Sequence, residues 1–76
     1  MGIDKQLKDD ENLIEVDRTS FGYIVTHRKG RRLLYTGSFN RESEAIRTAT
    51  KMAKHLEVCG EGVWYCLNYA FKNKDK

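Results

Sequence analysis

The sequence has no apolar run long enough to span a bilayer, and its first residues, "MGIDKQLKDDEN", lack the apolar core of a secretory signal. Gly2 follows Met1, but position 6 is Gln6 rather than the serine or threonine of an N-myristoylation signal. These absences lead us to expect a cytoplasmic protein with no membrane partner.

Cysteine is scarce, and both residues, Cys59 and Cys66, are expected to be reduced in that compartment, although the sequence leaves a bond between them open. A closed zinc site takes four ligands and usually contains a C-x₂₋₄-C pair. Only His55 stands near the two cysteines, and His27 is expected at a distant hairpin tip. We therefore expect no metal and no cofactor.

The motifs of common catalytic sites are also missing. The chain contains no G-x-S-x-G, no P-loop and no H-E-x-x-H, and its carboxylate cluster Asp9-Asp10-Glu11 falls in a polar lead-in. A nucleophilic cysteine needs a helix N-terminus or a cationic neighbour, whereas Cys59 is expected near a helix C-terminus. These observations favour a binding module over an enzyme.

What the chain does contain is enough for one small, mildly basic domain of 76 residues, with a net charge of +3 and a pI near 9.0. That charge permits nucleic acid or an acidic protein as the partner. We expect a disordered lead-in over residues 1–11, a single α+β domain over 12–71 and a basic tail over 72–76.

Alternating apolar residues predict strands at residues 13–18, 23–28, 31–36 and 63–71. Between the last two, a helix is expected to start at the N-cap Asn40 and to stop at Gly60. The predicted order is β-β-β-α-β, an α+β domain in which one helix packs on one face of an antiparallel sheet. The helical stripe that would cover the sheet is Ala45, Ile46, Ala49, Met52, Ala53 and Leu56.

The hairpin "HRKGRR" sets the predicted faces of the sheet. With Lys29-Gly30 as a two-residue loop, Arg28 would lie opposite Arg31, and Val25 opposite Leu34, with this second pair under the helix. The side chains predicted for the open face are Ile24, Thr26, Arg28, Arg31, Leu33 and Tyr35, joined by Trp64 of the last strand.

Two functions suit this open face. In the first, the sheet binds double-stranded DNA: its arginines anchor phosphates or guanine, and its apolar side chains touch base edges. The residues assigned to that role are Thr26, Arg28, Arg31, Arg32, Leu33 and Tyr35. In the alternative, the face binds protein without nucleic acid, as a homodimer or as a small phage-type inhibitor. Its apolar centre would be Ile24, Leu33, Tyr35 and Trp64. The plainer interpretation of the arginines at the hairpin end is that they are merely solvated. A third interpretation of the chain is a purely structural accessory domain.

The segment from Gly22 to Leu56 resembles the plant ethylene-response-factor DNA-binding domain and the arm-binding domain of phage integrases. The matching residues are Tyr23 and Val25, then Lys29-Gly30-Arg31-Arg32, Gly37-Ser38-Phe39, and Glu44-Ala45 with Ala49. The resemblance implies a three-stranded sheet that enters the major groove. Two positions depart from that pattern, because Tyr35 and Leu33 stand where those families carry a tryptophan and an arginine. The first strand, "LIEVDR", adds two acids.

Overall fold

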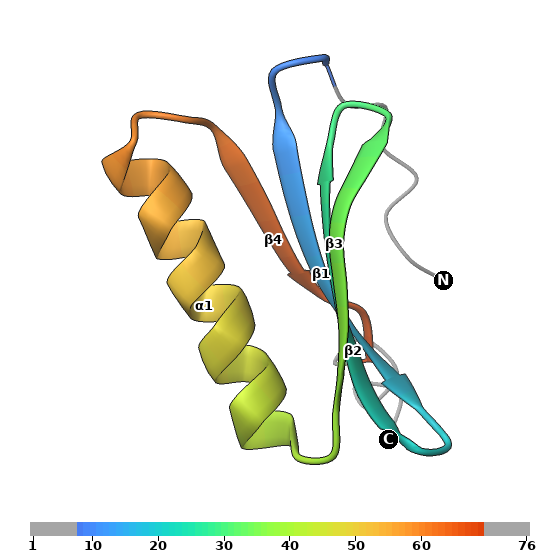
Figure 1. The fold of residues 1–76 in the computed structure, drawn as a ribbon. Coiled ribbons are helices and arrows are strands. Elements are labelled where there is room, and N and C mark those ends of the chain that lie inside the picture. The colour runs from blue at the N-terminus through green and yellow to red at the C-terminus, as the bar shows by residue number, and fades with distance from the viewer. Residues whose placement is uncertain (1–7, 70–76) are drawn as a thin grey trace.

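The computed structural model of the protein describes residues 8–69 (Figure 1). It is an α+β fold in which one helix packs on one face of a four-stranded sheet of order β3-β2-β1-β4, so the predicted fold class is confirmed. No helix in the described range is long and apolar enough to cross a membrane. The elements are β1 (Asn12–Thr19), β2 (Gly22–Lys29), β3 (Arg32–Phe39), α1 (Glu42–Val58) and β4 (Val63–Leu67).

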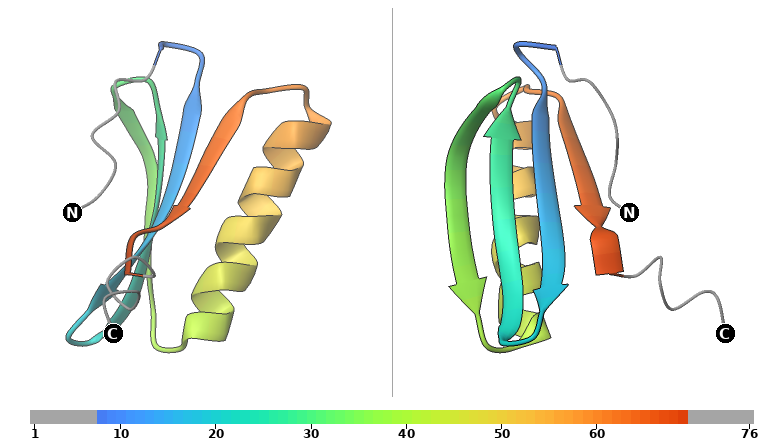
Figure 2. Two further views of the ribbon diagram at one scale, coloured as in Figure 1. Left: turned by 180° about the vertical axis from the view of Figure 1, so that it is seen from behind. Right: turned by 90° about the vertical axis from the view of Figure 1, so that its right-hand side faces the viewer.

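The sheet is mixed rather than wholly antiparallel as predicted. β2 runs antiparallel to both of its neighbours, whereas β1 and β4 run parallel (Figure 2). The cause is the crossover: α1 leads the chain from one edge strand, β3, across the sheet to the other edge strand, β4. β3 and β4 therefore point the same way, as does β1 between them.

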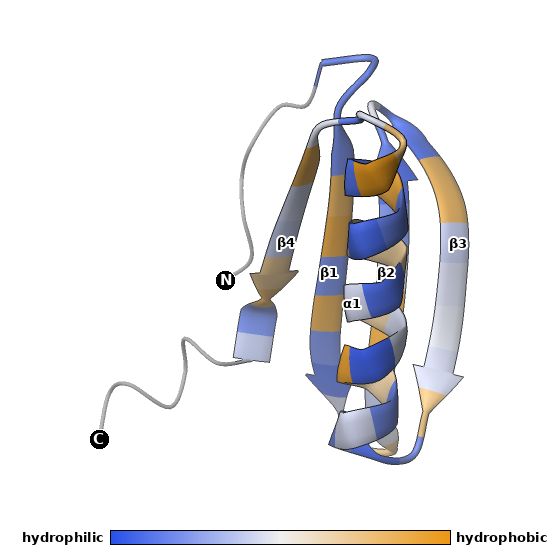
Figure 3. Ribbon diagram, turned by 90° about the vertical axis from the view of Figure 1, so that its left-hand side faces the viewer, coloured by the Kyte–Doolittle hydropathy of each residue, from blue (hydrophilic) through white to orange (hydrophobic). Residues whose placement is uncertain are grey.

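The core lies between α1 and the two central strands. Ile14, Val16 and Val25 project from β1 and β2 and are fully buried against Ala45 and Ala49 of the helix. Burial of each of the three larger side chains contributes about 1.5–3 kcal/mol. Seen from the helix side, α1 lies over β1 and β2 and leaves β3 uncovered beside it (Figure 3).

The helix begins one residue later than predicted. Its N-cap is Arg41, in an extended conformation and without a side-chain cap, so Asn40 does not fill that role. Glu42 and Glu44 stand in the first turn, where carboxylates offset the unpaired N–H groups. At the other end the chain leaves the helix at Gly60, as predicted, with φ at +82°.

The described residues at the two ends of the chain show where the last strand stops and what precedes β1. β4 ends at Leu67, and residues 68–69 form a short turn, so residues 70–71 of the predicted strand and the tail 72–76 lie outside the described residues, as do 1–7 of the lead-in. Residues 8–11 of that lead-in form a turn in which the Glu11 amide donates to the Lys8 carbonyl. The Glu11 carbonyl then accepts from the Gly30 amide at 2.9 Å, which joins this turn to the β2–β3 hairpin.

The register of that hairpin also differs from the predicted one. The loop is Gly30-Arg31, so Lys29 pairs with Arg32 and Arg28 pairs with Leu33. Gly30 takes φ +59°, and a β-carbon there would lie 3.0 Å from Asp9 Cα. The turn of residues 8–11 therefore packs closely against Gly30, where a larger residue would not fit. The loop is therefore shifted by one residue.

A bulge follows at Leu34, between the pairs Arg28–Leu33 and His27–Tyr35. Val25 consequently lies opposite Gly37 instead of Leu34. Since directly opposed residues share a face, Tyr35 lies with His27 on the helix side of the sheet. The predicted pairs Arg28–Arg31 and Ile24–Tyr35 are wrong.

Candidate interaction surface

The open face of the sheet is the surface to which the sequence assigned function. The observed register places Ile24, Thr26, Arg28 and Leu33 there, together with Trp64, which lies on the same face as Leu13. Five of the predicted positions are therefore on this face. The full set from the described strands is Leu13, Glu15, Asp17, Thr19, Ile24, Thr26, Arg28, Leu33, Thr36, Ser38, Trp64 and Cys66.

The other three predicted residues lie elsewhere. Arg31 is in the hairpin loop, and Arg32 pairs with Lys29 at the start of β3. Tyr35 lies on the helix side, where its hydroxyl comes so close to Gly37 that a β-carbon on that glycine would overlap it. The expectation that Tyr35 belongs to the open face is wrong, because the bulge at Leu34 changes the alternation of β3.

Exposed apolar surface gathers on β3. Leu33, Leu34 and Tyr35 are 58%, 51% and 38% exposed, although they are consecutive residues of a strand. By contrast, Ile24 is half-buried and Leu13 is buried on the open face itself. The exposed apolar run of the sheet is thus on its edge strand β3 rather than at the centre of the open face.

Two carboxylates occupy the middle of the open face. Glu15 and Asp17 are two residues apart on β1, and the side-chain amide of Asn68 donates to Glu15 Oε2 at 3.2 Å and to Asp17 Oδ1 at 2.8 Å. The Cys66 thiol in turn donates to Asn68 Oδ1. Burial raises the pKa of the Cys66 thiol, and the charges of Glu15 and Asp17 raise it further. The alternation of "LIEVDR" was the signal that these acids share a face.

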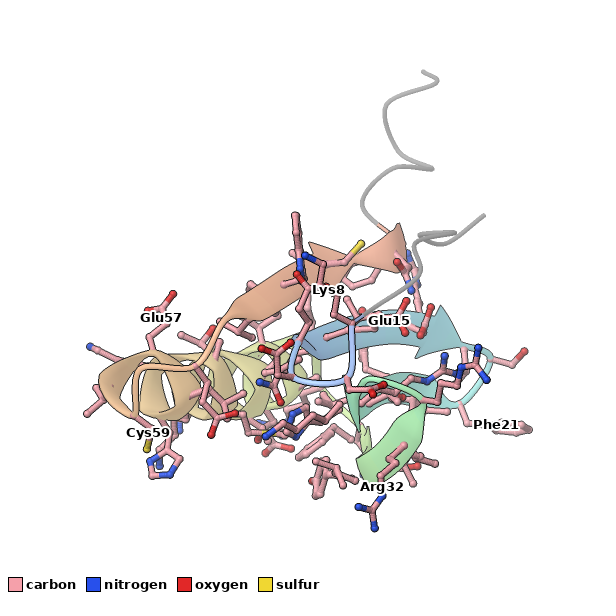
Figure 4. All side chains as sticks on the ribbon, turned by 90° about the horizontal axis from the view of Figure 1, so that it is seen from above. Lys8, Glu15, Phe21, Arg32, Glu57 and Cys59 are labelled. Atoms are coloured by element: carbon pink, nitrogen blue, oxygen red, sulfur yellow. The ribbon has the colours of Figure 1, made fainter. Side chains whose placement is uncertain are left out.

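The basic residues gather at the hairpin end. Arg28, Arg31 and Arg32 are exposed, and in Figure 4 the Arg32 side chain extends away from the sheet. In the described part of the chain the salt bridge is Lys29–Glu61, with Nζ and Oε1 3.2 Å apart, so the three arginines have no carboxylate partner there. Their charges are available to an anionic partner.

A polar network joins the start of β1 to the helix–β4 loop. The buried Asn12 donates from Nδ2 to Glu61 Oε1 at 3.1 Å and to the Gly62 carbonyl at 3.0 Å. Its Oδ1 lies 2.9 Å from His27 Nε2. Burial lowers the pKa of His27; the Glu61 carboxylate raises it by a smaller amount, and Lys29 lowers it further. The hydrogen bonds from Asn12 and Lys29 lower the pKa of Glu61.

A pocket of about 340 Å³ opens on the helix side, next to this network. It is lined by His27 of β2 and by Lys51, Met52, His55 and Leu56 of α1. His27 and His55 therefore line the same pocket, whereas the sequence pattern predicted that His27 would lie at a distant hairpin tip. No group of three or more histidine, cysteine, aspartate or glutamate side chains within residues 8–69 is arranged to hold a metal ion.

Comparison of the chain with protein-family models, with curated proteins and with solved structures finds no match in any of the three. The likeness to the ethylene-response-factor and integrase arm domains stays a prediction.

Proposed function

We propose that this domain is a non-catalytic protein-interaction module that binds its partner through β3. The observation that carries the proposal is the run of exposed apolar side chains Leu33, Leu34 and Tyr35 on a strand at the edge of the sheet. Edge strands of natural sheets are commonly short, charged or covered, and exposed apolar patches mark contact surfaces. β3 has eight residues and a single charged side chain, that of Arg32.

The charges of the open face favour a protein partner over a duplex. Glu15 and Asp17 stand at the centre of the surface that would enter a groove, where DNA phosphates repel carboxylates. Tyr35, assigned to base contacts, faces the other way. A protein surface can match acids and apolar groups alike, so a protein fits both β3 and the face beside it.

A duplex remains the second candidate, on the strength of one observation. Arg28, Arg31 and Arg32 are all exposed in or next to the hairpin loop and have no carboxylate partner among the described residues, which leaves their charges available for phosphate contacts. A shift assay with random duplex at two salt concentrations tests this. Each neutralised phosphate contributes a log–log slope of about −0.9. No binding at low salt would remove this candidate.

The main proposal is tested with the immobilised 76-residue chain and nuclease-treated lysate. We expect a protein to be retained by the wild-type chain and lost by Leu34→Asp, because a charge in the exposed run is costly to bury in an interface. The matched control is Phe21→Asp, which alters a residue that is 93% exposed in the β1–β2 turn. Equal retention by wild type and Leu34→Asp would reject β3 as the contact. Light scattering of the free chain identifies self-association.

A further inference from the structure

We infer that the partner is an extended acidic segment that adds to β3 as a fifth strand and places an apolar side chain between β3 and α1. This inference rests on the proposed function and specifies its partner. It depends on three independent features: the free edge of β3, the pocket between α1 and the neighbouring strand β2, and the charges around both.

The free edge supplies main-chain hydrogen bonds. Among residues 8–69, β3 pairs only with β2, and no turn, loop or cap hydrogen bond in that range involves its backbone. The N–H and C=O groups on its outer side are therefore available to a strand from another chain. Because the bulge at Leu34 interrupts the regular pattern, we expect the added strand to pair with residues 35–39.

The pocket supplies a place for a side chain. α1 leaves β3 uncovered on the helix side (Figure 3), and a strand added there would direct alternate side chains toward the helix. Met52 and Leu56 form the apolar part of the pocket, and His27 closes it from the sheet. Its volume of about 340 Å³ lies in the range of ligand sites, roughly 300–1,000 Å³.

The charges select an acidic segment. Lys51 and His55 line the pocket, and Lys54 joins them around an adjacent hollow that ends at Val58. Neither Lys51 nor Lys54 has a salt bridge to a described residue. The acid Glu44 lies about two helical turns before Lys51, so the acidic residues of the partner are expected toward the hairpin end. Arg31 and Arg32 lie at that end.

The experiment selects random peptides on the immobilised full chain and measures the best of them with the free protein. We expect the enriched sequences to be acidic with an apolar residue. We also expect hydrogen exchange, followed by NMR, to slow at the outward-facing amides of residues 35–39 when peptide is bound. Lys51→Glu should weaken peptide binding by about tenfold. The matched charge reversal Arg18→Glu, on an exposed residue at the far end of β1, should leave binding unchanged.

Five outcomes would overturn the inference. Enrichment of basic peptides would contradict the expected acidic partner. If Ile24→Asp abolished binding and Lys51→Glu did not, the site would lie on the open face. Protection of the β3 amides in a peptide-free dimer would make a second copy the occupant. If no peptide were enriched but a lysate protein were still captured in a way that depends on Leu34, the strand-addition inference would be rejected and the proposed function would not. Failure of both the peptides and the lysate capture would reject the proposed function as well.

Discussion

Nε2 of His27 lies 2.9 Å from Oδ1 of Asn12, a polar side chain that is completely buried. The amide nitrogen of Asn12 already donates to Glu61 and to the Gly62 carbonyl, so the oxygen must be the atom that faces the ring. An amide oxygen only accepts hydrogen bonds, and the proton must therefore sit on Nε2 of the imidazole. A single asparagine thus holds together β1, β2 and the loop that leads into β4.

Replacing this asparagine should destabilise the fold. Asn12→Leu leaves the ring nitrogen of His27, the Glu61 carboxylate and the Gly62 carbonyl without this partner. We expect the free energy of unfolding to fall by about 2–4 kcal/mol, as measured by urea denaturation. Thr36→Ala, at an exposed position, should change it by less than about 0.5 kcal/mol. A similar loss in both variants would contradict the role assigned to Asn12.

The free energy of unfolding should decrease as the pH falls below the pKa of a free imidazole. Burial holds the pKa of His27 below its ordinary value of 6.5, so the unfolded chain binds the proton first as the pH drops. The stabilising contribution is complete above about pH 6.5 and is lost toward the lower pKa of the folded state. Urea unfolding at about pH 7.5 and about pH 5.5 measures the difference.

The control for this pH effect is His27→Gln, whose amide can still donate to Asn12 but does not titrate. The charged or titratable groups near the ring are Glu61, Lys29, Lys51 and His55, and all of them are retained in this variant. We expect a smaller pH dependence in His27→Gln than in the wild type. An identical slope in the two proteins would show that His27 is not the responsible group.

Tyr69 connects the residues after β4 to the start of the helix, and removing its hydroxyl should destabilise the fold. Its hydroxyl donates to Glu42 Oε2 at 2.6 Å, and burial together with this hydrogen bond raises the pKa of Tyr69. Its ring also meets that of Tyr23 edge-on at 5.6 Å. We expect Tyr69→Phe, which keeps the ring, to cost about 1.5–3 kcal/mol. A double-mutant cycle with Glu42→Gln measures the coupling, and additive effects would contradict a direct bond.

Two glycines of the sheet should respond differently to alanine. At Gly22, φ is +148° and a β-carbon would collide with the backbone carbonyl of Phe39, so Gly22→Ala should cost more than about 2 kcal/mol. At Gly37 the colliding atom is the hydroxyl of Tyr35, a flexible side chain that is partly exposed. Gly37→Ala should therefore cost less than about 1 kcal/mol. Thermal unfolding of the two variants makes the comparison, and the reverse order would reject it.

The two thiols should react at different rates. Cys59 is free and exposed, next to His55 at the end of α1, whereas Cys66 is free and buried, and its pKa is raised. In an Ellman assay we expect one rapid equivalent from the native protein and a second only after denaturation. Cys59→Ser should remove the rapid phase. A native Cys66 that reacts equally fast would contradict the burial of its thiol on the open face.

The sequence pattern predicted the elements well but not how they align. Alternation found all four strands, and the stripe through Ala45 and Ala49 found the helix and the face that it buries. The same pattern failed at Tyr35. The bulge at Leu34 reverses the alternation there, and a bulge is defined by the pairing of β3 with β2, which the pattern of one strand does not contain. It also failed for the histidines, since His27 and His55 meet through packing between α1 and β2.

By itself the sequence determined the class of the fold, the order of its elements and the exposure of a basic hairpin, because periodicity and turn residues act over a few neighbouring positions. The tertiary structure decided the register, the direction of β4 and the neighbours of each functional side chain. The physical reason is that these depend on contacts between distant segments. The bond from the Gly30 amide to the Glu11 carbonyl joins the hairpin loop to the turn before β1, and the three bonds of Asn12 tie residues that lie up to 50 positions apart.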